Sequence, residues 1–350
     1  MTSIRPRPAT ITDIAKRAGV STATVSYVLN DTPGARIPEA TRSRVRSVAD
    51  ELGYVPHASA RSLRTGSSDL VLYVQMDVVQ GPLASRFLHD LSRGLRELGY
   101  TLMQYGPERS RGVKAARSWA GMRPSAVIAG DDRLTPAGIE LLRKADIRVI
   151  AVGTSSGRAK ELGVSTLTMD HHGLGEIAGR HLVERGCRDI ASVVPGQDVL
   201  RQMGERRLAG VRSGAGVAEE SGSGAGVGSG TGSEVTVRRH DMDWTPESAA
   251  ELVGTWLEEG LPDGVFGYND EFSGLLLGAL VDAGVRVPEQ VALVGADDVM
   301  LCQMLRPRLT SVRMESEDPE ATARRIVDAV RGRAEVHLSP WTPVLVQRET

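Results

Sequence analysis

From Leu70 onward, short apolar segments alternate with amphipathic segments of about 10–15 residues, and this alternation constrains the fold most. Uninterrupted apolar strands of this kind are typical of parallel sheets that helices cover on both faces. About ten strands over roughly 280 residues are more than one compact sheet needs. We therefore expect two doubly wound α/β lobes, with the carboxyl ends of their strands as the place for a ligand.

The first 56 residues follow a different pattern, which predicts three short helices around one small core. Two helices joined by a tight turn are predicted over residues 11–29, where Gly19 can end the first helix and Ser21 can cap the second. A third helix is predicted from Pro38 to about Leu52. This arrangement is a helix-turn-helix, so the expected fold class is an all-α head followed by an α/β body.

The charge also separates these two parts. Residues 1–64 carry ten basic and five acidic side chains, a net charge of +5; the whole chain carries −2, so the remainder carries −7. A small basic module before a large acidic one indicates a head that binds a polyanion and a body with another task.

Signals for catalysis, metal binding and secretion are absent from the sequence. Two cysteines, Cys187 and Cys302, exclude a disulfide framework and a cysteine-rich zinc site. His171, His172 and His181 lack further ligands at suitable spacing, so we expect solvated or loop histidines rather than a metal site. No phosphate loop, hydrolase motif, membrane-spanning segment or signal peptide is found. We therefore expect a cytoplasmic protein with no catalytic residue, metal or cofactor.

Two segments differ from both parts. Residues 57–66 permit a helix but expose Leu63 with little else apolar, so we expect them to order only on binding. Residues 213–233 consist largely of Gly and Ser, which predicts a disordered surface insertion rather than a dinucleotide-binding loop.

Several motifs together resemble the lactose-repressor (LacI/GalR) family of bacterial transcription regulators. In the head these are TITDIAKRAGVSTATVSYVLN at 10–30 and ELGYVPHASARSLRTG at 51–66. In the body they are RRLAG at 206–210, GYNDEFSGLLLGAL at 267–280 and VALVGADD at 291–298, in the order that the family shows. The resemblance covers the whole chain except the Gly/Ser insertion.

The resemblance implies a homodimer whose two heads bind a pseudo-palindromic operator, each with its second helix in the major groove. By this similarity Thr22, Ala23 and Tyr27 face the bases, and four other residues lie toward phosphates: Ser21, Thr24, Ser26 and Asn30. The alternative is an ordinary exposed helix surface. Tyr27 stands where the family often has arginine, so we expect a changed base preference there.

Residues 57–66 resemble the hinge helix that the family forms on operator DNA. By this similarity Leu63 wedges into the minor groove, and Ala60 lets the two hinge helices approach each other. His57 stands where asparagine is usual. The alternative is a linker whose leucine packs against the body.

The body resembles sugar-binding proteins of the periplasm, and the resemblance implies a small sugar-like effector between the lobes. Arg207, Asn269 and Asp297 match polar positions of the family's pocket, and Trp244 matches an aromatic that packs on the ligand. Each has a structural alternative: a helix salt bridge for Arg207, a helix cap for Asp297 and a core position for Trp244. In the first lobe, VVQGPLASRF replaces the family's usual stretch, and Asp77 and Arg86 are the candidates for effector contacts there. Asp170 matches an aspartate at the crossover between the lobes, for which a structural role is the alternative.

We thus predict a transcriptional repressor that is controlled by a small molecule, with induction or corepression left open. The expected domains are a head at 1–56, a hinge at 57–66 and a body at 67–350, divided into lobe 1 (67–168 and 299–340) and lobe 2 (169–298 and 341–350). A transporter's solute-binding protein would share the body but lacks a basic head. An α/β enzyme with a regulatory head is the other alternative, and a regulator that has lost its ligand is a third.

Overall fold

A computed structural model describes most of the chain, in ten stretches: 7, 9–32, 34–55, 68–77, 81–106, 109–153, 161–217, 234–316, 318–332 and 335–350. The chain divides into two compact units, Met1–Ser68 and Asp69–Thr350. The predicted hinge and residues 218–233 of the predicted insertion lie outside the described residues. Among those described, no helix combines the length and apolar character that spanning a membrane requires.

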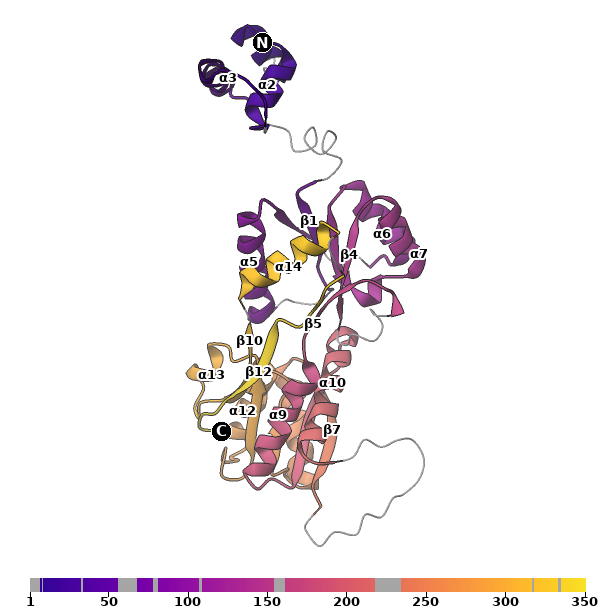
Figure 1. The fold of residues 1–350 in the computed structure, drawn as a ribbon. Helices are drawn as coiled ribbons and strands as arrows, with labels where there is room; N and C mark the ends of the chain where they lie inside the picture. The colour runs from indigo at the N-terminus through magenta and orange to yellow at the C-terminus, as the bar shows by residue number, and fades with distance from the viewer. Residues whose placement is uncertain are drawn as a thin grey trace, which may run out of the picture. The chain divides into compact units, whose positions relative to one another are not determined.

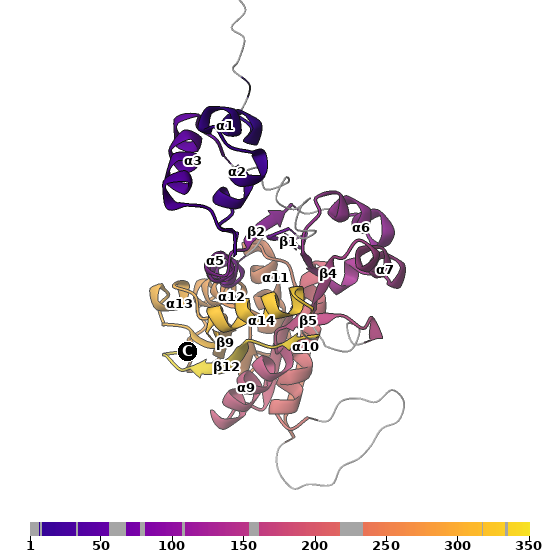
Figure 2. The same cartoon turned by 45° about the horizontal axis from the view of Figure 1, so that its top comes forward.

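The head contains the three predicted helices, α1 (Ile11–Ala18), α2 (Thr22–Leu29) and α3 (Glu39–Glu51) (Figure 2). Gly19 ends α1 in the left-handed conformation with φ 65°, and the Ser21 side chain caps α2 by accepting from an amide, as predicted. The helices enclose one small core of buried apolar side chains: Ile14, Ala15, Ala18, Val25, Val28, Val45, Val48 and Ala49.

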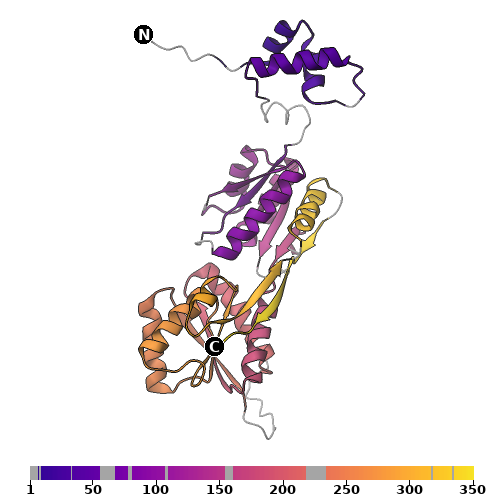
Figure 3. The same ribbon diagram turned by 90° about the vertical axis from the view of Figure 1, so that its left-hand side faces the viewer.

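The body contains two six-stranded sheets, and the predicted α/β class is confirmed. The first sheet is parallel in the order β11-β5-β4-β3-β1-β2. Its strands are β1 (Leu70–Val74), β2 (Thr101–Tyr105), β3 (Ala126–Gly130), β4 (Arg148–Gly153), β5 (Ser165–Thr168) and β11 (His337–Leu338). One face is covered by α5 (Pro82–Glu97) and α14 (Pro319–Val330), the other by α6 (Gly112–Gly121) and α7 (Pro136–Lys144) (Figures 1 and 3). A short 3-10 helix, Asp131–Arg133, follows β3.

The second sheet has the order β12-β10-β9-β8-β6-β7, in which only β12 is antiparallel. Its strands are β6 (Asp189–Pro195), β7 (Thr236–Met242), β8 (Gly264–Phe266), β9 (Ala292–Ala296), β10 (Thr310–Ser316) and β12 (Trp341–Val346). Its helices are α9 (His171–Glu184), α10 (Asp198–Gly214), α11 (Pro246–Glu259), α12 (Asp270–Asp282) and α13 (Leu301–Met304). The order reverses between β6 and β8, which makes the carboxyl ends of these strands a switch point where α/β sheets bind ligands.

The central strands of this second sheet, β6, β8 and β9, are buried on both faces. On β6, Ile190 and Val194 pack toward α9 and α10, whereas Ala191 and Val193 pack toward α11 and α12. This burial explains why the strands appear in the sequence as continuous apolar runs.

Two predicted boundaries are wrong. Residues 299–340 are expected in the first lobe, but β10 pairs with β9 and β12 in the second sheet. The chain therefore returns to the first sheet only after Ser316. The apolar run of β10 fits either sheet, and its pairing with β9 on one side and with β12 on the other places it in the second. The insertion was predicted to begin at Ser213, yet α10 continues to Gly214.

Candidate DNA-binding face and effector site

The second helix of the head has one buried and one exposed face. Val25 and Val28 are buried in the core, whereas Tyr27 is 47% exposed. Of the predicted DNA-contacting residues, Ser21, Thr22, Ala23, Tyr27 and Asn30 are exposed, and Thr24 and Ser26 are half-buried. An exposed helix face of short polar side chains and one aromatic can contact base edges and phosphates. His57, Ala60 and Leu63 lie outside the described residues.

In the body, α9 and α10 approach each other closely, and this contact positions Arg207. A Cβ added at Gly175 would lie 1.9 Å from the backbone oxygen of Arg207, and one added at Gly210 would lie 2.0 Å from the oxygen of His172. Only glycine fits at such distances. The glycines therefore bring the start of α9 against the middle of α10.

Arg207 is buried there and held by three groups. Its Nε donates to Nδ1 of His171 at 3.3 Å, and its Nη1 donates to the backbone oxygen of Tyr268 at 2.6 Å. Its guanidinium carbon lies 4.5 Å from the centre of the Tyr268 ring, within the range of a cation–π interaction. These contacts fix the guanidinium before any ligand arrives.

The buried histidine beside it is neutral. Burial, aided by the charge of Arg207, lowers the pKa of His171 to about 3. Accepting at Nδ1 places the proton of this neutral ring on Nε2. The expectation of solvated or loop histidines is wrong for His171 and His181, since both are buried. The fold encloses both rings: His171 lies against Arg207, and burial lowers the pKa of His181 as well.

Asp297 lies beside Arg207 with an unused acceptor. Its Oδ1 lies 3.6 Å from Nη2 of Arg207, too far for a hydrogen bond, and has no hydrogen-bond partner among the described residues. Burial raises the pKa of Asp297, and the charge of Arg207 opposes that rise. A buried acceptor without a donor is costly, so this carboxylate is suited to accept from a ligand hydroxyl.

The other two predicted effector residues also follow strands of the second sheet. Asn269 comes after β8, and its Oδ1 caps α12 by accepting from the amide of Phe272 at 3.0 Å, so its amide nitrogen remains the group for a ligand. Trp244 comes after β7 and is 48% exposed. Exposure argues against the core alternative for Trp244, because a core indole would be covered.

The weaker candidates are engaged elsewhere. Asp170 caps α9 by accepting from the amide of Gly173 at 2.8 Å, which is a structural role. Asp77 pairs with Arg109 at 3.3 Å, and the Arg86 guanidinium lies 4.0 Å from Asp90. A surface pocket of about 450 Å³ lies in the first lobe and contains none of the predicted effector residues; its lining is Ser85, Leu88, His89, Ser92, Arg93, Arg96 and Gln104.

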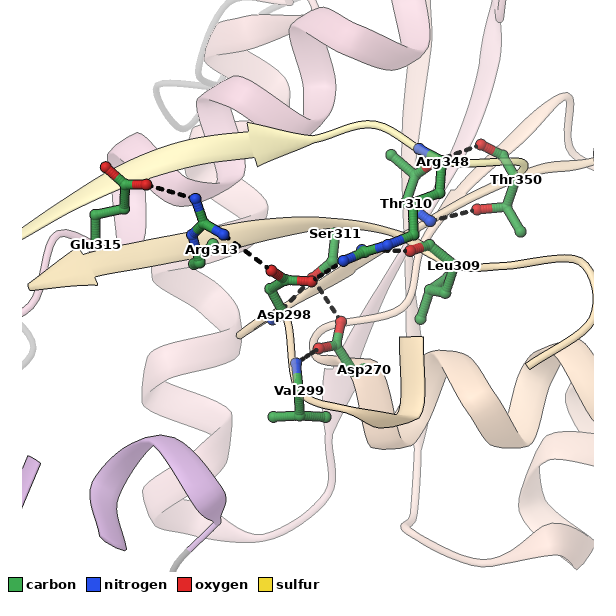
Figure 4. Close-up of polar contacts among 10 residues, drawn as sticks. All are labelled: Asp270, Asp298, Val299, Leu309, Thr310, Ser311, Arg313, Glu315, Arg348 and Thr350. Atoms are coloured by element: carbon green, nitrogen blue, oxygen red, sulfur yellow. Dashed lines mark hydrogen bonds and ion pairs between the residues drawn. The ribbon is translucent and has the colours of Figure 1, made fainter. Parts of the chain in front are cut away.

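Sequence reasoning missed the buried acid Asp270 beside this site (Figure 4). Its carboxylate accepts from the amide of Val299 at 2.8 Å and from the hydroxyl of Ser311 at 2.6 Å. Burial and the nearby charge of Asp297 raise the pKa of Asp270 to about 7. Its place directly after Asn269 in the motif was the only signal that could have found it.

An ion-pair cluster lies next to Asp270. Asp298 accepts from Arg348 at 2.5 Å and from Arg313 at 3.4 Å, so its buried charge is neutralised (Figure 4). Within the described part of the chain, no three histidine, cysteine or acidic side chains are grouped to hold a metal ion.

Comparisons with known proteins match both units. Residues 10–57 match the family described as "Bacterial regulatory proteins, lacI family", and residues 179–350 match "Periplasmic binding protein-like domain". The transcriptional regulator CelR of Thermobifida fusca is 30% identical over 341 residues, 94% of each chain.

Two solved structures share the architecture. A CelR–cellobiose complex is 27% identical with a TM-score of 0.62 and 99% of both chains covered. The lac repressor dimer bound to operator and the anti-inducer ONPF is 22% identical with a TM-score of 0.76, covering 98% of this chain and 99% of that one. The resemblance seen in the motifs is confirmed, and the chain belongs to the lacI family of bacterial transcriptional regulators.

Proposed function

We propose that this regulator is a repressor that acts in the cytoplasm and binds a pseudo-palindromic operator as a homodimer. The observation that carries this proposal is the exposed face of α2, which presents Thr22, Ala23 and Tyr27 away from the head's core. A helix of this kind fits the major groove, where all four base pairs can be distinguished. Leu63 of the proposed hinge then inserts into the minor groove at the centre of the site.

Selection of bound DNA from a random pool, using the full chain, tests the operator. We expect enrichment of a pseudo-palindrome, weaker binding by Leu63→Ala, and affinity that falls steeply with salt because phosphate contacts dominate it. Tyr27→Arg is expected to shift the preference at one base step toward guanine, by about 1–3 kcal/mol. An unchanged motif in that variant would contradict the assigned role of Tyr27, and no enrichment at any salt would contradict operator binding without a corepressor.

We also propose that the effector is a small, neutral, sugar-like metabolite. Arg207 offers a donor and Asp297 an acceptor 3.6 Å apart, which suits a pair of hydroxyl groups. Asn269, which follows β8, offers a further polar contact, and the exposed ring of Trp244, which follows β7, offers an apolar one. Cellobiose, held by CelR in its solved complex, is the first probe.

Thermal shift of the full chain with single sugars tests this site. A sugar that stabilises the wild type should fail to stabilise Asp297→Asn, whereas Asp77→Asn in the first lobe should respond as the wild type does. If no neutral sugar binds but another metabolite does, the assignment of the effector class is wrong.

The homodimer is supported by exposed apolar side chains on neighbouring elements of the second lobe. Met300, directly before α13, and Met304, its last residue, are 67% and 70% exposed, and Val281 on α12 is exposed as well. Large exposed apolar groups of this kind mark interaction surfaces. If a second copy of the chain covers these side chains, the double variant Met300→Glu, Met304→Glu should be monomeric in light scattering. Leu257→Glu on α11, where the leucine side chain is 52% exposed, serves as the control and should remain dimeric.

A further inference from the structure

Asp270, the first residue of α12, joins two segments of the proposed effector site. Its Oδ2 accepts from the amide of Val299 at 2.8 Å and its Oδ1 from the hydroxyl of Ser311 at 2.6 Å (Figure 4). Asp270 directly follows Asn269, and Val299 lies two residues after Asp297. One buried carboxylate therefore connects the chain segments that carry two proposed effector contacts.

The segment that Asp270 holds has strained backbone. Asp297 and Asp298 have φ angles of 95° and 49°, a region that residues other than glycine rarely adopt. Such conformations persist only where the surroundings impose them. Here the Ser311 hydroxyl accepts from the Asp298 amide at 3.1 Å while it donates to Asp270. The bonds to Asp270 and Ser311 thus hold the backbone that presents Asp297.

The charges around Asp270 make this connection sensitive to protonation. Asp297 and burial favour the neutral acid, whereas the donors on Ser311, Val299 and Cys302 favour the carboxylate, and the resulting pKa is about 7. The carboxylate of Asp298 is paired with arginines, and Asp297 faces Arg207. Glu271, the next residue on α12, also has a pKa raised by burial and by Asp297. A protonated carboxyl accepts hydrogen bonds less strongly than a carboxylate does.

We propose that Asp270 is a positioning residue of the effector site, which ties the Asn269 segment to the Asp297 segment, and that protonation of its carboxylate loosens this tie and weakens effector binding. The second half of the proposal rests on the proposed effector site. Val299 lies two residues before α13, so the hydrogen bond from its amide to Asp270 also positions the helix that presents Met300 and Met304.

Hydrogen exchange of the full chain, followed by mass spectrometry between pH 6 and 8, tests the tie without any ligand. The readout is protection of the amides of residues 297–302, corrected for the intrinsic pH dependence of exchange. In the wild type we expect protection to rise about tenfold across this range, the equivalent of one hydrogen bond to a charged group. In Asp270→Asn it should be low and independent of pH, whereas Glu271→Gln, the matched charge control, should keep the wild-type rise.

Ser311→Ala provides a second variant, should Asp270→Asn fail to fold. It removes a donor that favours the carboxylate, so the rise in protection should move to higher pH. Equal protection of the wild type at pH 6 and pH 8 would overturn the proposal, as would a pH-dependent rise that survives in Asp270→Asn or disappears in Glu271→Gln.

Calorimetric titration with cellobiose and then ribose tests the effect on the effector. A sugar that binds the wild type should bind more weakly at pH 6 than at pH 8, and about tenfold more weakly to Asp270→Asn at pH 8. If a sugar binds with an affinity that changes neither with pH nor in Asp270→Asn, the effector half of the proposal is contradicted. If neither sugar binds, the proposed effector class is at fault, and the exchange experiment still decides whether the tie exists.

Discussion

The two lobes share one architecture but treat charge at their strand ends differently. In the second lobe, Arg207 and Asp270 are buried and each has fixed partners. In the first lobe Arg133, which follows β3, is also buried beside Asp132, but the candidate residue Asp77 pairs with Arg109 in contact with water, and the Arg109 side chain is 93% exposed. A buried charge requires defined partners, whereas an exposed one exchanges them for water. At these residues the second lobe fixes the geometry of the proposed effector site, whereas the pair of Asp77 and Arg109 in the first lobe fixes no comparable geometry.

Removing one arginine from each lobe should produce the largest difference in stability between variants of the two lobes. Arg207→Met leaves the Tyr268 carbonyl without its donor and the Asp297 charge without the neighbouring guanidinium, so we expect the free energy of unfolding to fall by about 3–5 kcal/mol. Arg109→Met in the first lobe should change it by less than about 0.5 kcal/mol. Urea denaturation of both variants measures the difference, and a similar small loss in each would show that the two lobes do not differ.

The pH dependence of stability should reveal two opposing groups in the second lobe. The pKa of His171 is lowered to about 3 by burial, so its contribution to stability is lost as pH falls below about 6.5. The pKa of Asp270 is raised to about 7, so its contribution is lost as pH rises from about 4 toward 7. Each slope is about 1.4 kcal/mol per pH unit, and between pH 4 and 6.5 the two oppose each other.

Single variants separate these slopes. In His171→Asn, the free energy of unfolding should decrease as pH rises from 4 to 6.5, because the lowered pKa of His171 no longer opposes the raised pKa of Asp270. In Asp270→Asn it should increase over the same range, because the raised pKa of Asp270 no longer opposes the lowered pKa of His171. Denaturation at four pH values tests both. Parallel slopes in the two variants would show that at least one pKa assignment has the wrong direction.

Close helix packing offers a smaller test of the same contrast. Ala at Gly210 would place its Cβ against the backbone of α9, so we expect a loss of about 1–3 kcal/mol and a displaced Arg207. Gly121 on α6 in the first lobe has open space around it, so Gly121→Ala should be neutral or stabilising by up to about 1 kcal/mol. Thermal unfolding compares the two, and a neutral Gly210→Ala would mean that the helices can separate without cost.

Much of the fold could be predicted because it rests on local patterns. The turn at Gly19, the cap at Ser21 and the apolar strands of both sheets each follow from a few neighbouring residues. The lobe boundary after β10 could not be predicted, because which sheet an apolar strand joins is decided by pairing partners distant in the sequence.

The residues of the proposed effector site also fall into those that the sequence predicts and those that it does not. Arg207 and Asp297 could be identified from motifs, and the structure brings them together. The residues that position Arg207 and the segment of Asp297 could not be identified from the sequence, because His171 and Asp270 act through burial and through contacts made by the fold. Periodicity shows which face of a helix is apolar, but not which polar group is enclosed beside another.

The smallest expected effect concerns a feature that both lobes share. Asp170 caps α9 in the second lobe and Thr135 caps α7 in the first, each accepting one amide hydrogen bond at 2.8 and 3.2 Å. Because caps act locally, Asp170→Ala and Thr135→Ala should each cost about 1 kcal/mol of stability, equal within about 0.5 kcal/mol. Sugar affinity should change in neither variant. If Asp170→Ala abolished sugar binding at this modest cost, Asp170 would be an effector contact and the site would extend beyond the buried charges of the second lobe.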